Sequence, residues 1–218
     1  MSSPLSIAIL GASGYTGVEL LRFLLAHPHA RITALSGDSQ AGKSMAEVFP
    51  HLTGIPLPTL QKIEEIDFSA IDLVFCCLPH GTTQSVIAKL LPSPEIASAI
   101  STSPSGRGKS ALKIIDLSAD FRLRDPATYA QWYGHPHQAT ELQKTAVYGL
   151  TEIHRAAIAK ARLVANPGCY PTSAQLPLIP LIQNRLIETG DIIIDAKSGV
   201  TGAGRKASQN LLYTEINE

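Results

Sequence analysis

The chain contains 218 residues, of which 44% are hydrophobic, and its 18 basic residues balance its 18 acidic residues. A neutral chain gives no electrostatic reason to expect nucleic acid or an anionic membrane as a partner, and no apolar run approaches the length of a membrane span. The three cysteines do not form a disulfide framework, and the N-terminal residues lack the pattern of a secretory signal. We therefore expect a soluble protein of a reducing compartment, the cytoplasm.

The N-terminal segment has the order strand, glycine-rich turn, helix. Residues 5–10 form a short apolar run typical of a buried parallel strand, and residues 18–25 repeat leucine and valine at helical spacing until Pro28. The glycines between them allow the backbone to approach a pyrophosphate at a helix N-terminus, although a tight turn without a ligand would also use glycine. The cofactor-binding residues expected in this turn are Gly11, Ser13, Gly14, Tyr15, Thr16 and Gly17.

The end of the second expected strand, residues 31–35, bears on which dinucleotide binds. A site that prefers NAD usually carries an acidic residue there for the ribose 2′-hydroxyl. This chain has instead Ser36, Ser39 and, close behind, Lys43, a set that suits the 2′-phosphate of NADP. We expect NADP as the cofactor, while Asp38 leaves NAD open.

Residues 37–44 also match the P-loop pattern G-x-x-x-x-G-K-[ST] at every position. A P-loop is followed by a sturdy helix, whereas Pro50 ends any helix that begins after Ser44. A magnesium-dependent nucleotidase is therefore an alternative that the helix length disfavours. It predicts ATP binding that the Lys43→Ala substitution abolishes.

A further buried strand is expected over residues 72–78, followed by a helix over residues 82–91. Ligands of parallel sheets bind beyond the carboxyl ends of the strands. The segment between these two elements, Pro79, His80 and Gly81, is therefore expected to line the cofactor site.

Arg122 follows another expected strand, residues 113–117. An arginine just past a strand end is suited to clamp a carboxylate or phosphate through two parallel hydrogen bonds. Local ion pairing with Asp120 or Asp125 is an equally good interpretation of the same residues.

Residues 125–145 are expected to be irregular. They contain His135 and His137 on either side of Pro136. No cysteine or carboxylate cluster accompanies these histidines, so we predict a surface loop and no metal site.

Cys169 is the candidate nucleophile. It follows a short expected strand, residues 162–165, and the sharp turn of Pro167 and Gly168. The next residues are expected to begin a helix, whose unpaired N–H groups and dipole favour a thiolate. Free cysteines are also common as small buried groups, so packing is the alternative role.

The helix after Cys169 is expected to be kinked or interrupted at Pro177 and Pro180. Residues 191–196 are rich in isoleucine and are expected to form a strand. The glycine-rich segment after this strand is expected to approach a ligand closely, with Ser198 and Gly199 as cofactor-binding residues.

Several motifs in this order together resemble the N-acetyl-γ-glutamyl-phosphate reductase family. The resemblance covers essentially the whole chain, and its most specific parts are the segments around Arg122 and Cys169. The motifs are Gly11–Gly17, Leu78–Gly81, Asp116–Arg122, Tyr148–Leu150, Asn166–Thr172 and Lys197–Lys206.

The resemblance implies an α/β fold. Residues 1–150 would form a Rossmann-type, doubly wound parallel sheet that binds NADP. Residues 151–218 would begin an α+β, semialdehyde-dehydrogenase-like catalytic domain with a mixed sheet. Family chains continue beyond the point that corresponds to Glu218 and carry an acid/base histidine there, so this chain alone is expected to turn over poorly. The full-length protein is expected to be a homo-oligomer.

The resemblance also implies the reaction. Cys169 would attack N-acetyl-L-glutamyl 5-phosphate to give a thioester, which NADPH reduces to N-acetyl-L-glutamate 5-semialdehyde, a step of arginine biosynthesis. Arg122 and Asn166 would bind the substrate. Two alternatives remain open: a reductase of another acyl phosphate such as aspartyl phosphate, and a non-catalytic NADP-binding protein in which Cys169 only packs.

Overall fold

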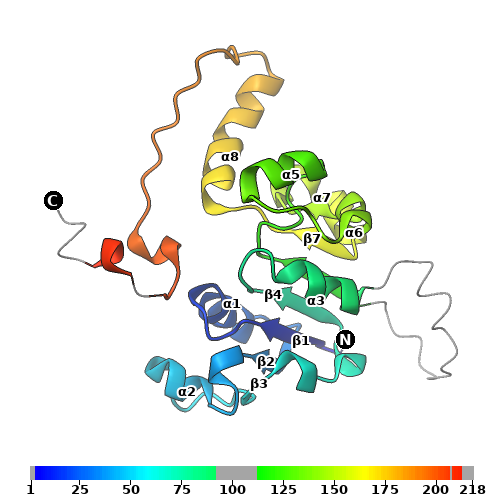
Figure 1. Cartoon of the computed structure of the whole chain (residues 1–218), viewed down its shortest axis with the longest axis vertical. Coiled ribbons are helices and arrows are strands. Elements are labelled where there is room, and N and C mark those ends of the chain that lie inside the picture. Colours follow the sequence, from blue (N-terminus) through cyan, green and yellow to red (C-terminus); the bar gives the residue numbers. More distant parts are fainter. Residues whose placement is uncertain (1–2, 92–111, 207, 213–218) are drawn as a thin grey trace, which may run out of the picture. The chain divides into compact units, whose positions relative to one another are not determined.

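The computed structural model describes residues 3–91, 112–206 and 208–212. The chain divides into two compact units, residues 1–166 and 167–218 (Figure 1). The N-terminal segment expected to form the dinucleotide domain, residues 1–150, lies inside the first unit. That unit also includes the helix and the strand that follow residue 150.

A single parallel sheet forms the centre of the first unit. Within the described residues it has seven strands in the order β3-β2-β1-β4-β5-β7-β6, and every neighbouring pair is parallel. β2 and β3 lie on one side of β1, and the later strands lie on the other side, as expected for a doubly wound sheet. The strands are β1 (Leu5–Leu10), β2 (Ala30–Ser36), β3 (Leu60–Gln61), β4 (Leu73–Cys76), β5 (Lys113–Asp116), β6 (Val147–Tyr148) and β7 (Leu163–Ala165).

The register of the sheet brings four strand ends level with one another. Leu10 pairs with Cys76, Cys76 pairs with Asp116, and Asp116 pairs with Ala165. The segments that follow these residues therefore leave the same edge of the sheet. Ligands of open parallel sheets bind at this edge.

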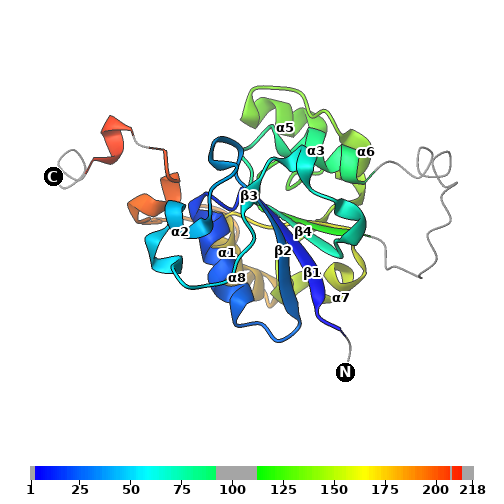
Figure 2. The same ribbon diagram turned by 90° about the horizontal axis from the view of Figure 1, so that it is seen from below.

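Helices cover both faces of the sheet, and each face has its own hydrophobic cluster. Alternate residues of β1 point to opposite faces: Ile7 and Ile9 pack with Leu21 of α1, whereas Ala8 and Leu10 pack with Ile87 of α3. Figure 2 shows α1 and α7 on one face and α3, α5 and α6 on the other. The described helices of the first unit are α1 (Tyr15–Leu25), α2 (Met45–Val48), α3 (Thr83–Leu90), α5 (Pro126–Tyr133), α6 (Thr140–Thr145) and α7 (Thr151–Lys160).

Residues 125–145 are not irregular, which corrects the sequence-based expectation. Asp125 caps α5 by accepting hydrogen bonds from the N–H groups of Ala127 and Thr128, and Pro126 occupies the first helical position, where it needs no N–H partner. Gly134 ends the helix in the left-handed conformation with φ of 76°. The loop after α5 buries the ring of His137 rather than exposing it.

The second unit contains α8 (Cys169–Gln183) and short 3₁₀ turns, of which the first spans Val200–Ala203. A kink or an interruption was expected at Pro177 and Pro180, and the helix continues through both prolines without an interruption. Residues 191–196 do not form a strand, which corrects another expectation, because no strand of residues 167–206 or 208–212 lies beside them to complete a ladder. Ile193 in this segment is 91% exposed.

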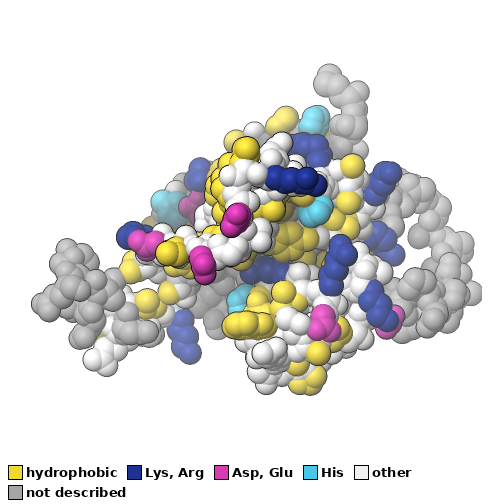
Figure 3. Space-filling view, turned by 90° about the horizontal axis from the view of Figure 1, so that it is seen from above, with side chains coloured by type: hydrophobic (Ala, Val, Ile, Leu, Met, Phe, Trp, Pro, Cys, Tyr) yellow, Lys and Arg dark blue, Asp and Glu magenta, His cyan; other side chains and the backbone are white. Residues whose placement is uncertain are grey.

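The described surface carries both charge signs. Figure 3 shows Lys and Arg side chains on the same face as Asp and Glu side chains. No helix in the described part of the chain is long and apolar enough to cross a bilayer. The described residues also contain no group of three or more His, Cys, Asp or Glu side chains that could hold a metal ion.

Candidate functional site

The turn between β1 and α1 needs glycine at two positions because a Cβ there would clash with neighbouring backbone atoms. Gly11 has a φ of 80°, and a Cβ there would lie 2.4 Å from the carbonyl oxygen of Cys77. A Cβ on Gly17 would lie 2.6 Å from the Cα of Ala12. These glycines allow β1, β4 and α1 to pack closely.

At Gly14, the remaining glycine of the turn, packing within the protein does not require the absence of a side chain. Its φ is −89°, and among the described residues a Cβ there would meet just the carbonyl oxygen of Gly11, at an ordinary 3.5 Å. Gly14 is the N-cap of α1, whose first turn has no acidic side chain. The unpaired N–H groups of this helix N-terminus remain accessible where Gly14 lacks a side chain, a geometry that fits a bound pyrophosphate.

The three polar residues expected to contact the 2′-phosphate, one at the end of β2 and two after it, differ in their access to solvent. Ser36 is buried, and its Oγ accepts a hydrogen bond from the N–H of Gly11 at 3.0 Å, so this hydroxyl links β2 to the glycine-rich turn. Ser39 and Lys43 are exposed, and the Lys43 ammonium donates to Gln40 at 3.0 Å. Ser39 and Lys43 are therefore the residues of this set that a 2′-phosphate can reach.

The P-loop interpretation of residues 37–44 does not fit the local structure. The helix after Lys43 is α2, which has four residues. Ser44, which would bind magnesium in a P-loop, caps α2 instead through reciprocal hydrogen bonds with Glu47. Two features of a phosphate cradle, a long helix and a free hydroxyl, are therefore lacking.

The segment after β4 is held by the turn that follows β5. His80 accepts a hydrogen bond through Nδ1 from the N–H of Ala119 at 2.9 Å. The N–H of Gly81 donates to both carboxylate oxygens of Asp120, at 2.9 and 3.0 Å. The sequence alone does not indicate Asp120 as a site residue.

The last residue of β5, Asp116, provides a second buried carboxylate. Asp116 accepts hydrogen bonds from the N–H and the hydroxyl of Ser118, at 2.9 and 2.7 Å. Burial raises the pKa of Asp116 to about 6 in spite of these hydrogen bonds. Burial also raises the pKa values of the two neighbouring thiols, that of Cys77 to about 12 and that of Cys76 well above its ordinary value.

Arg122 forms neither of the ion pairs that its local sequence allowed. Among the described residues, no ion pair involves this guanidinium. It donates instead from Nε to the carbonyl oxygen of Asn166 at 2.8 Å and from a terminal nitrogen to that of Leu117 at 2.9 Å. Arg122 therefore links the end of β5 to the residue that precedes the Pro167 turn.

Cys169 is the first residue of α8 and is exposed. The first turn of α8 is closed by Thr172, whose N–H and hydroxyl both donate to the carbonyl oxygen of the N-cap residue Gly168. Two cavities of about 450 and 530 Å³ in the second unit share Cys169, Tyr170 and Ser198 in their linings. A thiol in this position can reach a ligand in either cavity.

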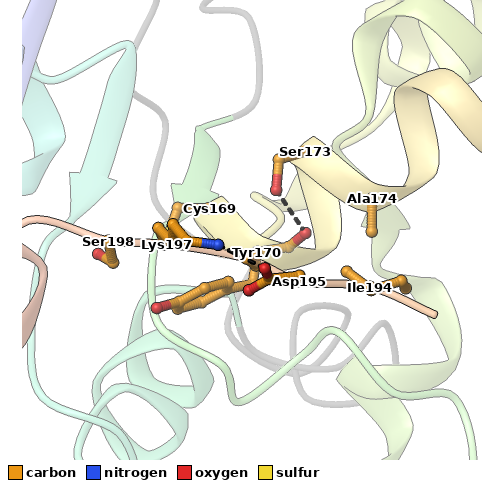
Figure 4. Close-up of a pocket in the computed structure, with 9 residues that line it drawn as sticks. Cys169, Tyr170, Ser173, Ala174, Ile194, Asp195, Lys197 and Ser198 are labelled. Carbon is orange, nitrogen blue, oxygen red and sulfur yellow. Dashed lines mark hydrogen bonds and ion pairs between the residues drawn. The ribbon is translucent and has the colours of Figure 1, made fainter.

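Figure 4 shows Cys169 beside the extended segment that carries Lys197 and Ser198. Lys197 forms an ion pair with Asp195 in the same segment. Gly199 lines the larger cavity with Ser198. The structure thus brings two of the expected ligand-contacting residues, Ser198 and Gly199, to the candidate nucleophile.

Comparison with known families identifies both units. Residues 6–161 match the family described as semialdehyde dehydrogenase, NAD binding domain. The chain belongs to the semialdehyde dehydrogenase family. Residues 169–218 match the family described as semialdehyde dehydrogenase, dimerisation domain.

Curated semialdehyde dehydrogenase relatives include an N-acetyl-gamma-glutamyl-phosphate reductase of Rhodospirillum rubrum, 59% identical over 218 residues, which are 100% of this chain and 58% of the relative. A probable chloroplastic enzyme of the same name from Arabidopsis thaliana is 58% identical over 212 residues, which are 97% of this chain and 48% of the relative. The chain thus spans about half the length of these relatives. Both support the resemblance inferred from the motifs.

Solved semialdehyde dehydrogenase structures share the fold. Aspartate semialdehyde dehydrogenase II of Vibrio cholerae, complexed with ASA, aligns with a TM-score of 0.56 and 18% identity over 94% of this chain and 49% of that chain. At this identity the likeness concerns the fold alone. It confirms the α/β architecture.

Within this semialdehyde dehydrogenase chain, the expected site residues fall into two groups. Those of the first unit lie at the carboxyl edge of the sheet or in the segments that follow it, and those of the second unit lie around the N-terminus of α8. The first group comprises Gly11, Ser13, Gly14, Tyr15, Thr16, Gly17, Ser36, Ser39, Lys43, Pro79, His80, Gly81, Arg122 and Asn166, and the second comprises Cys169, Ser198 and Gly199.

Proposed function

We propose that this chain carries the dinucleotide site and the nucleophile of an NADPH-dependent acyl-phosphate reductase. The substrate is N-acetyl-L-glutamyl 5-phosphate, and the products are N-acetyl-L-glutamate 5-semialdehyde and phosphate, in arginine biosynthesis. The observation that carries this proposal is the exposed Cys169 at the first position of α8, lining two cavities. Relatives that are 59% and 58% identical bear the name of this activity.

Cys169 performs the first chemical step. Its thiolate sulfur attacks the acyl carbon, the carbon–oxygen bond to phosphate breaks, and phosphate leaves with the electron pair of that bond. The product is a thioester on Cys169. The unpaired N–H groups in the first turn of α8 are available to stabilise the oxyanion that forms during the attack.

NADPH, when bound, supplies a hydride for the thioester carbon. The turn around Gly14 would hold the pyrophosphate of this cofactor, and Ser39 and Lys43 would contact its 2′-phosphate. Once the thioester carbon is reduced to an alkoxide, the alkoxide collapses, the carbon–sulfur bond breaks, and the aldehyde leaves. Cys169 then regains its thiolate for the next cycle.

Arg122 and Asn166 are the proposed substrate-binding residues. The guanidinium of Arg122 has five N–H donors, and two of its nitrogens donate to backbone carbonyl oxygens. The remaining donors can bind the phosphate or carboxylate of the substrate. Because Arg122 also bonds the backbone of Asn166, the same side chain would connect substrate binding to the segment that leads to Cys169.

The protein is proposed to be a homo-oligomer of the cytoplasm. The second unit matches a family described as a dimerisation domain, which supports the first part of this proposal. Three free cysteines suit a reducing compartment, which supports the second part.

The test is a steady-state assay of NADPH oxidation, with N-acetylglutamyl phosphate and aspartyl phosphate offered separately to a chain of the relatives' length. We expect turnover with the first substrate, and loss of turnover in Cys169→Ser by at least about a thousandfold, because the alcohol is a far weaker nucleophile. Cys76→Ser, which changes a buried thiol outside the site, is the control.

Each alternative function predicts a different result in this assay. Preferential turnover of aspartyl phosphate would assign a different substrate. NADPH binding without turnover of either substrate would indicate a non-catalytic dinucleotide-binding protein. Equal activity of wild type and Cys169→Ser would show that Cys169 is not the nucleophile.

A further inference from the structure

Four buried or part-buried polar groups from distant parts of the first unit form one hydrogen-bonded chain. Gln84 donates from Nε2 to the hydroxyl of Tyr129 at 2.8 Å, and this hydroxyl donates to Oδ1 of Asp120, also at 2.8 Å. The Asp120 carboxylate in turn accepts the N–H of Gly81 on both of its oxygens. The side chains of Gln84, Asp120 and Tyr129 are at most 1% exposed.

Asp120 is fixed through its backbone as well as through its carboxylate. Its N–H donates to Oγ of Ser118 at 3.1 Å. Its carbonyl oxygen accepts a hydrogen bond at 2.8 Å from Nε2 of His137, whose Nδ1 accepts the N–H of Ala139. Since every polar group of Asp120 has a partner, the carboxylate has one defined position.

This network would be costly if it served packing alone. Burying a carboxylate is unfavourable unless it is compensated, and no Lys or Arg of the described residues forms an ion pair with Asp120. The compensation comes instead from an O–H and a backbone N–H. An apolar side chain at this place would avoid the cost, but it could not fix the N–H of Gly81.

The network fixes the segment that follows β4. Gly81 has a φ of 80° and is bound to Asp120, while its neighbour His80 accepts the N–H of Ala119. Two consecutive residues of this segment are therefore bonded to two consecutive residues of the turn after β5. This pairing defines the position of the Pro79–Gly81 backbone at the edge of the sheet.

The strand order indicates which half of the dinucleotide this segment meets. β2 and β4 flank β1 on opposite sides. If the pyrophosphate lies at the turn after β1 and the 2′-phosphate lies beside the end of β2, the nicotinamide half extends toward the end of β4. Pro79, His80 and Gly81 come three to five residues after the last residue of β4, Cys76.

We propose that Asp120 is a positioning residue for the nicotinamide half of the cofactor. Its carboxylate, oriented by Tyr129 and Gln84, holds the Pro79–Gly81 backbone in the conformation that receives this half of NADP. The inference rests on the proposed function, because it assumes that the chain binds NADP. It assigns Asp120 no contact with the reacting atoms.

The experiment compares two ligands of the 218-residue chain by calorimetric titration: NADP⁺, and adenosine 2′,5′-bisphosphate, which lacks the nicotinamide half. The two test variants are Asp120→Asn, which sets an amide N–H group against the N–H of Gly81, and the milder Tyr129→Phe, which removes one hydrogen bond to the carboxylate. The matched control is Tyr133→Phe. Tyr133 lies on the same helix and stacks on Tyr129, and its hydroxyl forms no hydrogen bond within the described part of the chain.

We expect Asp120→Asn to weaken NADP⁺ binding by about tenfold and to leave the bisphosphate dissociation constant within about twofold of wild type. Tyr129→Phe should weaken NADP⁺ binding by a smaller factor and likewise leave the bisphosphate constant within about twofold of wild type, and Tyr133→Phe should change neither constant. If the role of Asp120 were purely structural, Asp120→Asn would weaken the binding of both ligands to the same extent. Folding of each variant is checked by thermal unfolding, and Tyr129→Phe carries the test if Asp120→Asn does not fold.

Three results would overturn the inference. Unchanged NADP⁺ binding in folded Asp120→Asn or Tyr129→Phe would show that the network does not position this segment for the cofactor. Equal weakening of NADP⁺ and the bisphosphate would assign Asp120 a general structural role. Failure of the wild-type chain to bind either ligand would refute the proposed cofactor site itself, and the inference with it.

Discussion

The guanidinium of Arg122 donates a hydrogen bond from Nε to the carbonyl oxygen of Asn166, 44 residues later in the chain, at 2.8 Å. A second bond from the same guanidinium reaches the carbonyl oxygen of Leu117. The planar fork of an arginine can serve two acceptors in fixed directions, which the ammonium of a lysine cannot do. Arg122 therefore joins the ends of β5 and β7 whether or not it also binds substrate.

Arg122→Lys should destabilise the chain by about 1–3 kcal/mol, because it leaves part-buried carbonyl oxygens without their charged donor. Urea unfolding measures this loss. Arg124→Lys is the control, since Arg124 is exposed and has no hydrogen bond or ion pair among the described residues. Equal stability of the two variants would show that the bonds of Arg122 contribute nothing to folding.

Cys169 should react with iodoacetamide far faster than Cys76 or Cys77. It is exposed, whereas burial removes Cys76 from solvent and raises the pKa of Cys77 to about 12. Compared with a free thiol of pKa ~8.5, such a group has about three-thousandfold less thiolate at neutral pH. Peptide mass spectrometry after brief labelling measures the three rates. All three thiols should react in urea, and equal labelling in the folded chain would contradict the prediction.

NADPH should bind more tightly than NADH. The exposed Lys43 and Ser39 lie after β2, where a 2′-phosphate can reach them. Lys43→Ala should reduce the preference by about tenfold and should make it less sensitive to salt, because it removes one solvent-exposed charge interaction. Lys89→Ala, which removes an exposed ammonium from α3, is the control. Titrations that give equal affinities for NADH and NADPH in wild type would refute the 2′-phosphate site.

Asp116 should make the chain more stable as the pH falls from 6 to 4. Its pKa is about 6 in the folded chain, against an ordinary 3.8, because it is buried. Between these values the folded state binds more protons than the unfolded state, so the free energy of unfolding rises on acidification, by at most about 3 kcal/mol. Asp116→Asn should abolish this contribution. Urea unfolding at pH 4, 5, 6 and 7 measures it.

His137 has the opposite effect on the pH dependence of the free energy of unfolding. Burial lowers the pKa of His137, so its unfolded form binds the proton more readily and stability is lost as the pH falls below about 6.5. In wild type the two effects partly cancel. Asp116→Asn should therefore lose stability on acidification more steeply than wild type, and identical pH profiles would show that Asp116 is not protonated at an elevated pKa.

A chain of the relatives' length should turn over N-acetylglutamyl phosphate about 10²–10⁴ times faster than these 218 residues. The relatives are longer, and a positioned general acid–base typically contributes a factor of this size. NADPH oxidation by the two chains under the same conditions measures the ratio. Comparable rates would mean that a histidine of the 218 residues transfers the proton, and His80→Gln would then be the variant to test.

Local patterns in the sequence determined the elements that positioned the site. The apolar run of residues 5–10 and the glycines after it predicted the β1–α1 turn, because a buried parallel strand and a close backbone approach each require particular residues over a few positions. The turn of Pro167 and Gly168 likewise predicted a helix that begins at or just after Cys169, and α8 begins at this residue. Pro50 predicted that the helix after Lys43 is short.

Other features depended on partners far away in the sequence. Residues 191–196 have the composition of a strand, yet a strand needs a neighbour, and the described residues of the second unit supply none. His137 was predicted to lie at the surface, but it is buried because its ring bonds the backbone of Asp120 and packs edge-on against Phe121 and Tyr129.

In the candidate site, too, the sequence indicated a residue type, but distant partners decided the contacts of Arg122 and Asp120. The sequence indicated a functional arginine after β5, but it could not distinguish an ion pair with Asp120 from the bonds to Leu117 and Asn166 that the structure contains. Nothing in the local sequence of Asp120 indicates Gly81 or Tyr129 as its partners. The register of β4 and β5 decides both, because it brings the segments that follow these strands to one edge of the sheet, where a side chain meets whatever the neighbouring strand presents.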